Sequence, residues 1–259
     1  MNLRPRLTKK TLIIGGVAAW GLLLISCVAV NRTLLAPPTI VGANFVGNKA
    51  CTECHEEHTS KFVGSAHARL NLTDDKVGVT GCEACHGPGS LHVKAGGSKS
   101  TIVNPKKSPE ACFSCHTDKR GEFSLPNSHQ VMNGKMSCSD CHDPHEGKGV
   151  RGKGASLEAQ NETCTKCHSS QEGPFVFKHN AMKEGCVACH SPHGSVNAKM
   201  LVARDANLCL RCHLQTTDKN GSIFVGGEDH RTRLQNGTCW VAGCHEAVHG
   251  SHTSKPLRY

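Results

Sequence analysis

Residues 138–145 read Cys-Ser-Asp-Cys-His-Asp-Pro-His, and the first five of them form the pattern C-x-x-C-H. The pattern occurs seven times between residues 51 and 213. Its cysteines are Cys51/Cys54, Cys82/Cys85, Cys112/Cys115, Cys138/Cys141, Cys164/Cys167, Cys186/Cys189 and Cys209/Cys212, followed by His55, His86, His116, His142, His168, His190 and His213. C-x-x-C-H is the attachment signature of c-type haem, so the repeats predict covalent haem sites.

The spacing of the motif has a mechanical reason. Positions i, i+3 and i+4 share one face of a helical turn, so two thiols can bond the porphyrin vinyl groups while the histidine reaches the iron. We therefore expect helix starts just before the motifs, at Ser108-Pro109 and at Asp205. An eighth site, Cys239 to Cys244-His245, has four intervening residues and cannot form a regular turn, although Gly243 would let it bend.

Two other uses of cysteine are possible in principle. Zinc sites would combine paired C-x-x-C units and need no histidine after every second cysteine. Disulfides would not place a histidine after all eight pairs. The sequence therefore predicts eight haems held by sixteen thiols.

The composition indicates what fills the interior. The chain has 17 cysteines and 18 histidines, whereas only 4% of its 259 residues are aromatic. Its hydrophobic share of 37% includes the motif cysteines and an apolar N-terminal run, so side chains alone cannot build a sizeable core. We expect a multihaem cytochrome c fold: a haem-cored domain with short helices, irregular loops and little or no sheet.

The histidines outside the motifs form a second pattern. Grouping the haem sites in consecutive pairs gives four modules, at residues 51–92, 112–145, 164–193 and 209–249 within an octahaem domain at 49–254. Each module has one intervening histidine between its two motifs and one following histidine after the second. The intervening histidines are His67, His129, His179 and His230, and the following ones are His92, His145, His193 and His249. These eight are the predicted distal ligands of the eight irons, in a repeat that stacks units into an array.

The following histidines cannot easily serve their own haem. His145 and His193 lie three residues beyond the proximal His142 and His190, too close to pass around the porphyrin ring. We therefore expect them to bind a neighbouring haem. The two remaining histidines, His58 and His252, are expected to be exposed polar residues.

Methionine is the rival axial ligand, and it would raise the reduction potential. Met132, Met136, Met182 and Met200 are available, but each module already has enough histidine. We expect Met132 and Met136 to pack near Cys138. Gly-rich linkers are predicted after two of the modules, at 96–100 and 147–154.

Residues 1–30 predict export. A basic segment precedes 14 apolar residues at 12–25, which fits a secretory signal. Three fates remain open for this segment: lipidation at Cys27 in a lipobox-like Leu-Ile-Ser-Cys, an uncleaved membrane anchor over residues 11–30, or cleavage to a soluble product. Residues 31–48 are expected to be a tether. We expect a periplasmic protein tethered to a membrane, with the outer membrane favoured.

The charge balance argues against a nucleic-acid binder. Of 30 basic residues, Arg4, Arg6, Lys9 and Lys10 precede the apolar run, which leaves 26 against 21 acidic residues. These lie along the chain without the clustering and aromatic interleaving of a nucleic-acid surface.

The eight motifs, the paired histidines and the His-Pro-His and Cys-His-Glu-Ala-Val-His-Gly phrases resemble periplasmic multihaem cytochromes of the dimethyl-sulfoxide-respiration and metal-reduction type. Those proteins are decahaem, and this chain is similar to their shorter octahaem relatives in porin-cytochrome conduits. The resemblance covers about residues 48–252. It implies electron transfer from periplasmic or inner-membrane donors, through an outer-membrane β-barrel porin, to an outer-surface multihaem cytochrome.

Two other functions were weighed against electron transfer. An octahaem oxidoreductase of nitrogen or sulfur compounds would need an iron with an open position, yet every motif ends in His and spare histidines can close all eight sites. A haem-filament subunit would need axial histidines donated between subunits. The sequence favours an electron carrier with no catalytic residues.

Overall fold

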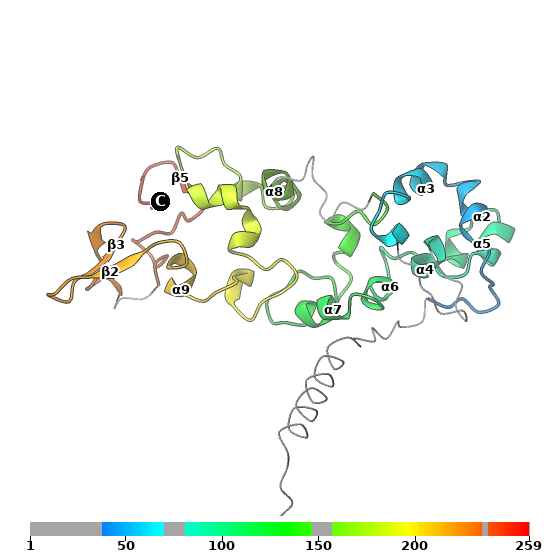
Figure 1. Cartoon of the computed structure of the whole chain (residues 1–259), viewed down its shortest axis with the longest axis horizontal. Helices are drawn as coiled ribbons and strands as arrows, with labels where there is room; N and C mark the ends of the chain where they lie inside the picture. The colour runs from blue at the N-terminus through cyan, green and yellow to red at the C-terminus, as the bar shows by residue number, and fades with distance from the viewer. Residues whose placement is uncertain (1–37, 70–80, 147–156, 235–237, 259) are drawn as a thin grey trace, which may run out of the picture. The chain divides into compact units, whose positions relative to one another are not determined.

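The computed structural model describes residues 38–69, 81–146, 157–234 and 238–258. Residues Ala36–Tyr259 form one compact unit. Short helices joined by loops make up most of it (Figure 1). The α-helices are α2 (Asn48–Thr52), α3 (Glu56–Phe62), α4 (Cys82–His86), α5 (Ser90–Lys94), α6 (Glu110–Phe113), α7 (Thr117–Phe123), α8 (Leu157–Thr165) and α9 (Ala206–Cys209). Single 3-10 turns cover His67–Arg69, Lys99–Thr101, Cys138–Asp140, Ser169–Gln171, Asn180–Glu184, Cys186–Ala188 and Ala198–Met200.

The helices that carry motifs begin close to the expected positions. Pro109 precedes α6 and Asp205 precedes α9, but neither makes a side-chain cap hydrogen bond. The Asp205 carboxylate instead pairs with the Arg204 guanidinium at 2.9 Å. At Cys138–Asp140, Ser137 and Asp140 form a reciprocal capping box, which satisfies backbone N–H groups that the turn leaves free.

Within the described residues, sheet structure consists of two small antiparallel sheets. In one, β1 (Phe177–Lys178) pairs with β5 (Gly250–Ser251), with Phe177 opposite Ser251. The other has the order β2-β3-β4, with strands Gln215–Thr217, Ile223–Val225 and Glu228–Asp229 (orange in Figure 1). The prediction of short helices, irregular loops and little sheet is confirmed.

The hydrophobic core made by side chains is small. Phe113, Phe123 and Val131 form the buried cluster, and Met136 and Cys138 pack against it. The prediction for Met136 is therefore correct. The prediction for Met132 is wrong, because its side chain is 45% exposed and lies outside the cluster. So few buried apolar groups are consistent with an interior completed by porphyrins.

The described part of the predicted tether is attached to the haem domain. The carboxylate of Glu83, which is only 4% exposed, accepts hydrogen bonds from the backbone N–H groups of Val46, Gly47 and Gly89 at 2.8–3.2 Å. The hydroxyl of Ser90 accepts another from Asn44 at 2.8 Å. Residues 44–47 are therefore anchored onto α4 and α5.

Several N-terminal and linker predictions lie outside the described residues. These are the export segment at 1–30, the lipidation site Cys27, and the linker at 147–154. Among the residues that are described, no helix is long and apolar enough to cross a membrane.

Candidate haem sites

Each regular motif closes one turn of backbone. The N–H of the motif histidine donates to the carbonyl of the first cysteine, four residues earlier, at 2.9–3.0 Å in six motifs. The second motif forms the whole of α4, Cys82–His86. This bond brings both cysteines and the histidine to one side of the chain, as the spacing predicts.

The eighth motif forms a wider turn. The His245 N–H donates to the Cys239 carbonyl six residues earlier at 3.1 Å, and Cys244 donates to Val241 at 3.0 Å. Gly243 adopts φ +82°, a left-handed conformation that glycine enters without steric cost. The prediction that this glycine bends the longer spacer is confirmed.

The structure places every proximal histidine opposite one of the eight predicted distal histidines. The ring centres are 6.0–6.4 Å apart in all eight pairs. The pairs are His55–His92, His86–His145, His116–His67, His142–His193, His168–His129, His190–His249, His213–His179 and His245–His230.

This separation fits one iron between two imidazoles. A metal–nitrogen bond of about 2.0 Å, with the nitrogen roughly 1.1 Å from its ring centre, gives roughly 6.2 Å between the centres of two opposed ligands. The His58 ring is also close to two of these histidines. It lies 6.3 Å from the His55 ring, with the two rings tilted by 44°, and 5.1 Å from the His145 ring, which is too short for an iron between them. Within the described ranges, no group of three or more His, Cys, Asp or Glu residues could hold a metal ion directly.

The second ring nitrogen of many of these histidines is hydrogen-bonded to backbone. Nδ1 lies 2.5–3.0 Å from a carbonyl oxygen in His86, His92, His129, His179, His190, His230 and His245. A carbonyl can only accept, so Nδ1 carries the proton and Nε2 is left as the free donor for a metal.

The β1–β5 sheet positions two distal histidines from distant parts of the sequence. His179 follows β1 and His249 precedes β5, and the Nδ1–H of His179 donates to the carbonyl of Val248 at 2.9 Å. Gly250 is required here, because a Cβ at this position would lie 2.4 Å from ring atoms of Phe175.

Two consecutive hairpins position His230. Gly226 and Gly227, both with positive φ, form the tight turn between β3 and β4 that leads into this histidine. Its backbone N–H donates to Ile223 at 2.7 Å, and its Nδ1–H donates to the carbonyl of Glu228 at 2.8 Å.

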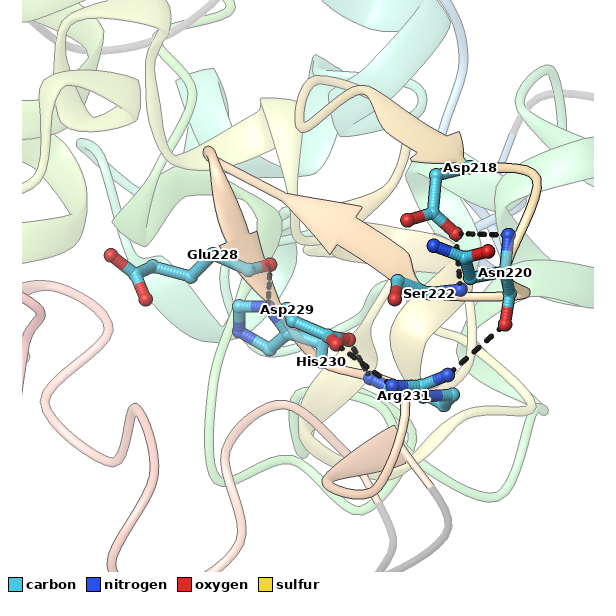
Figure 2. A network of polar contacts seen from close by, with 7 residues as sticks. All are labelled: Asp218, Asn220, Ser222, Glu228, Asp229, His230 and Arg231. Atoms are coloured by element: carbon cyan, nitrogen blue, oxygen red, sulfur yellow. Dashed lines mark hydrogen bonds and ion pairs between the residues drawn. The ribbon is translucent and has the colours of Figure 1, made fainter.

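A polar network surrounds His230 (Figure 2). The Asp218 carboxylate closes the β2–β3 turn by accepting from the backbone of Asn220 and Ser222 at 2.9 and 2.8 Å. The Arg231 guanidinium joins that turn to the next by donating to the Asn220 carbonyl at 3.2 Å and to Asp229 at 3.4 Å. The network therefore ties the residue after His230 to the far end of the β2–β3 hairpin.

The pairing follows a rule that the sequence pattern did not supply. In the interior, the intervening histidine of one module lies opposite the first proximal histidine of the next module, as His67 does with His116. The following histidine lies opposite the second proximal histidine of the preceding module, as His145 does with His86. The two ends differ, because His92 faces His55 and His230 faces His245 in their own modules.

Contacts between cysteines show how the motifs follow one another. Within each module the first cysteines of the two motifs interact: Cys51 with Cys82, Cys112 with Cys138, Cys164 with Cys186 and Cys209 with Cys239. Between modules the second cysteines are neighbours: Cys85 with Cys115, Cys141 with Cys167, and Cys189 with Cys212. The eight motifs are therefore adjacent in the order of the sequence.

Four of the sixteen predicted attachment cysteines are exposed in the protein chain. Each is the second cysteine of the first motif in its module: Cys54, Cys115, Cys167 and Cys212.

The position of Cys54 in its motif nevertheless agrees with the predicted chemistry. Its backbone N–H donates to the Cys51 carbonyl at 3.3 Å, inside the same turn that His55 closes at 2.9 Å. A thioether needs the sulfur to be accessible to the porphyrin vinyl group, so exposure on the chain does not exclude attachment. The role of Cys54 as a haem-attachment residue stays a prediction.

The free thiols, before haem attachment, have shifted pKa values. Burial and the neighbouring Cys82 raise the pKa of Cys51 to about 11, and burial and Cys239 raise that of Cys209 to about 12. A hydrogen bond from Cys112 lowers the pKa of Cys138 to about 7. None of the sixteen described cysteines forms a disulfide.

Three polar residues with structural roles at these sites were not predicted from the sequence. Asn48 and Asn161, each three residues before the first cysteine of a module, accept a hydrogen bond from the backbone of Cys82 and Cys186 at 3.0 and 2.9 Å. The recurrence of asparagine at this position in two modules was the available signal. Glu122 lies behind His193 and has no local sequence signal, because the two are 71 residues apart.

Comparison with known proteins agrees with these sites. The family model described as the doubled CXXCH motif matches residues 129–173 and 179–218. The multihaem cytochrome MtrA of Shewanella baltica is 31% identical over 210 residues, which are 79% of this chain and 58% of MtrA. The chain is a multihaem c-type cytochrome. Its C-x-x-C-H motifs bind haem c covalently.

Two further relatives are longer multihaem cytochromes. The C-type polyheme cytochrome OmcB of Geobacter sulfurreducens is 26% identical over 226 residues, covering 72% of this chain and 28% of OmcB. The multihaem cytochrome MtrC of Shewanella baltica is 27% identical over 180 residues, covering 60% of this chain and 26% of MtrC. The chain thus spans about three fifths of MtrA and about a quarter of the other two.

Proposed function

We propose that this chain is an electron-transfer cytochrome with eight haems, each iron held between two histidines. The observation that carries the proposal is the placement of all eight proximal histidines at 6.0–6.4 Å from eight different distal histidines. When bound, haem supplies one-electron chemistry at low potential, as is usual for bis-histidine ligation.

The cysteine contacts support a single route for electrons. Neighbouring motifs contact each other alternately through their first and their second cysteines, so these cysteines would hold successive haems next to one another in sequence order. The residues themselves make this order: each module pairs its own two motifs, and the second motif contacts the first motif of the next module. The proposed path runs from Cys51/Cys54 to Cys239/Cys244.

The same ligand set favours a carrier over an enzyme. Catalysis at haem iron needs a coordination position that substrate can take, and with haem bound the paired histidines would supply two ligands to the iron at each of the eight sites. The imidazoles are also held from behind by backbone carbonyls, which disfavours their release.

For the route through the cell, we propose the periplasmic part of a porin-cytochrome conduit. The resemblance to octahaem relatives in such conduits and the similarity to MtrA and MtrC support this assignment. The proposed partners are an outer-membrane β-barrel porin, an outer-surface multihaem cytochrome, and periplasmic or inner-membrane donors. The basic and apolar N-terminal segment supports export, with attachment to a membrane through lipid on Cys27 or through a helix.

The test uses the holoprotein isolated from solubilised membranes. Intact mass should show eight covalent haems, and electron paramagnetic resonance should show low-spin iron only. A mass with seven haems would show that the Cys239/Cys244 site is empty. A high-spin signal together with turnover of nitrite or hydroxylamine would favour the oxidoreductase, and filaments in electron micrographs would favour the assembly subunit.

The conduit proposal needs a separate measurement. A β-barrel protein should co-purify with the tagged full-length chain after mild solubilisation. If no β-barrel protein co-purifies although all haems are present, the conduit proposal is wrong and the electron-transfer proposal stands.

A further inference from the structure

A carboxylate lies directly behind one of the paired histidines. The Oε2 of Glu122, in α7, is 3.0 Å from the Nδ1 of His193, in the loop after the sixth motif. The other side of the His193 ring faces His142, at 6.0 Å between ring centres. The contact therefore links a charged side chain to the proposed distal ligand of the fourth haem, attached at Cys138 and Cys141.

Several contacts hold this pair in place. Asn127 and Ser195 exchange backbone hydrogen bonds at 3.2 and 2.8 Å, which docks the His193 loop onto the segment after α7. Gly194 allows the approach, because a Cβ there would lie 2.0 Å from the Glu122 carbonyl oxygen. The ring of Phe123, part of the buried cluster, lies 5.3 Å from the His193 ring.

A cation and an imidazole share the Glu122 carboxylate. The Lys119 ammonium donates to Glu122 Oε1 at 2.6 Å, and the Nδ1 of His193 lies 3.0 Å from Oε2. A carboxylate accepts the Nδ1–H in this arrangement, which leaves the Nε2 of the His193 ring as the donor for iron. Lys119 also contacts Asp118 at 3.1 Å.

The same loop offers an internal reference. The carbonyl of Pro192, one residue before His193, accepts the Nδ1–H of His129 at 2.7 Å. His129 faces His168 and thus serves the next haem in the proposed order. Two adjacent sites are therefore supported by one loop, with a neutral acceptor behind one distal histidine and an anionic acceptor behind the other.

We propose that Glu122 is a positioning residue that lowers the reduction potential of the haem attached at Cys138 and Cys141. A carboxylate behind a metal-bound imidazole increases the basicity of that ligand, which stabilises the more positive, oxidised iron. This inference rests on the proposed function, because it requires His193 to bind the iron. It predicts that the middle of the haem chain contains a site whose potential is set by α7.

The test is Glu122→Gln in the full-length holoprotein. Glutamine keeps a hydrogen-bond acceptor of nearly the same shape behind His193 and removes only the charge. At a fixed potential near the midpoint, the ratio of reduced to oxidised iron at this haem should rise about tenfold, a shift of about 59 mV for a one-electron couple. Redox titration followed by magnetic resonance resolves the haems, and the ligand-field signature of the same haem should change.

The matched control is Asp118→Asn. It removes the same charge from the same ion-pair group around Lys119 but makes no contact with His193. We expect it to move this potential much less than Glu122→Gln does. Equal shifts in the two variants, or no shift in Glu122→Gln while all haems stay low-spin, would overturn the inference and leave the proposed function intact.

A third variant separates the two proposals. His193→Ala should make one haem high-spin if this histidine is the ligand. Unchanged low-spin spectra in this variant would contradict the ligand assignment itself and the inference with it.

Discussion

The histidine pairs of the interior modules differ from those of the two end modules. In the interior, each module passes one histidine forward and one backward, as His129 to His168 and His193 to His142. In the first and last of the four modules, one histidine instead lies opposite a proximal histidine of its own module, as His92 does with His55 and His230 with His245.

This difference shows that each module is a repeat in the sequence, but that its histidine pairs are not contained within it. In an interior module, both proximal histidines lie opposite predicted distal histidines that belong to neighbouring modules. Its two motifs still hold each other through their first cysteines, as Cys112 and Cys138 do. Thiol contacts therefore define the module, whereas histidine exchange joins the modules into one structure.

The largest effect is expected when one histidine paired with another module and one paired within its own module are removed in turn. His145→Ala should leave the haem at Cys82/Cys85, in the preceding module, with an open position, because His145 lies opposite His86. His230→Ala should instead affect the haem at Cys239/Cys244 in its own module. In each variant one haem should become high-spin and its potential should rise, which assigned paramagnetic spectra can follow.

The control for these variants is His252→Ala, whose ring lies near Phe175 and opposite no motif histidine among the described contacts. It should leave all haems low-spin. If His145→Ala changed the haem of His142 instead, ligand exchange between modules would be wrong.

A smaller effect is expected from Gly250→Ala. The new Cβ would overlap the Phe175 ring, and relieving this overlap should cost about 1–3 kcal/mol of folding free energy. Because the β1–β5 sheet holds both His179 and His249, the spectra of two haems in different modules, at His213 and His190, should change together. Gly121→Ala, where a Cβ meets nothing within 4 Å, is the matched control. A change confined to one haem would show that the sheet does not couple them.

The smallest effect concerns the widened eighth motif. Gly243→Ala places a side chain at φ +82° without any steric neighbour, so only backbone strain of about 1 kcal/mol opposes it. We expect intact mass spectra to show a larger fraction of chains with seven haems, in which His230 and His245 have no iron between them. Gly64→Ala, at a position without positive φ, should leave the haem count unchanged. Equal counts in both variants would mean that the longer spacer needs no glycine.

Much of the architecture could be predicted because the motif carries its own geometry. The four-residue spacing from Cys51 to His55 requires one helical turn, and the scarcity of aromatic and aliphatic residues excludes a large side-chain core. The same local reasoning identified Gly243 as the residue that bends the eighth site. The eight distal histidines remain a prediction, which their positions support.

The partners of those histidines could not be read from the sequence. Which haem His67 faces depends on how two modules dock, and docking is set by contacts between residues far apart in the chain, such as Asn127 with Ser195. The expectation for Met132 failed because local proximity to Cys138 says nothing about which face of the chain is turned inward.

The burial of individual motif residues also could not be predicted from the local sequence. Cys51 and Cys54 belong to one motif, yet Cys54 is exposed and Cys51 is half-buried. Their difference follows from docking, because Cys51 contacts Cys82 of the next motif. Anchoring of residues 44–47 by Glu83 was missed for the same reason.

The exchange of histidines also constrains how such a chain can change its length. With the proposed ligands, an interior module would give two histidines and receive two, so duplicating such a module would leave every histidine and every iron matched. Adding or losing a single motif would instead strand one iron or one histidine. Growth by whole pairs of haems would therefore preserve complete coordination. The doubled-motif matches at residues 129–173 and 179–218 each contain two motifs, the second of one module and the first of the next.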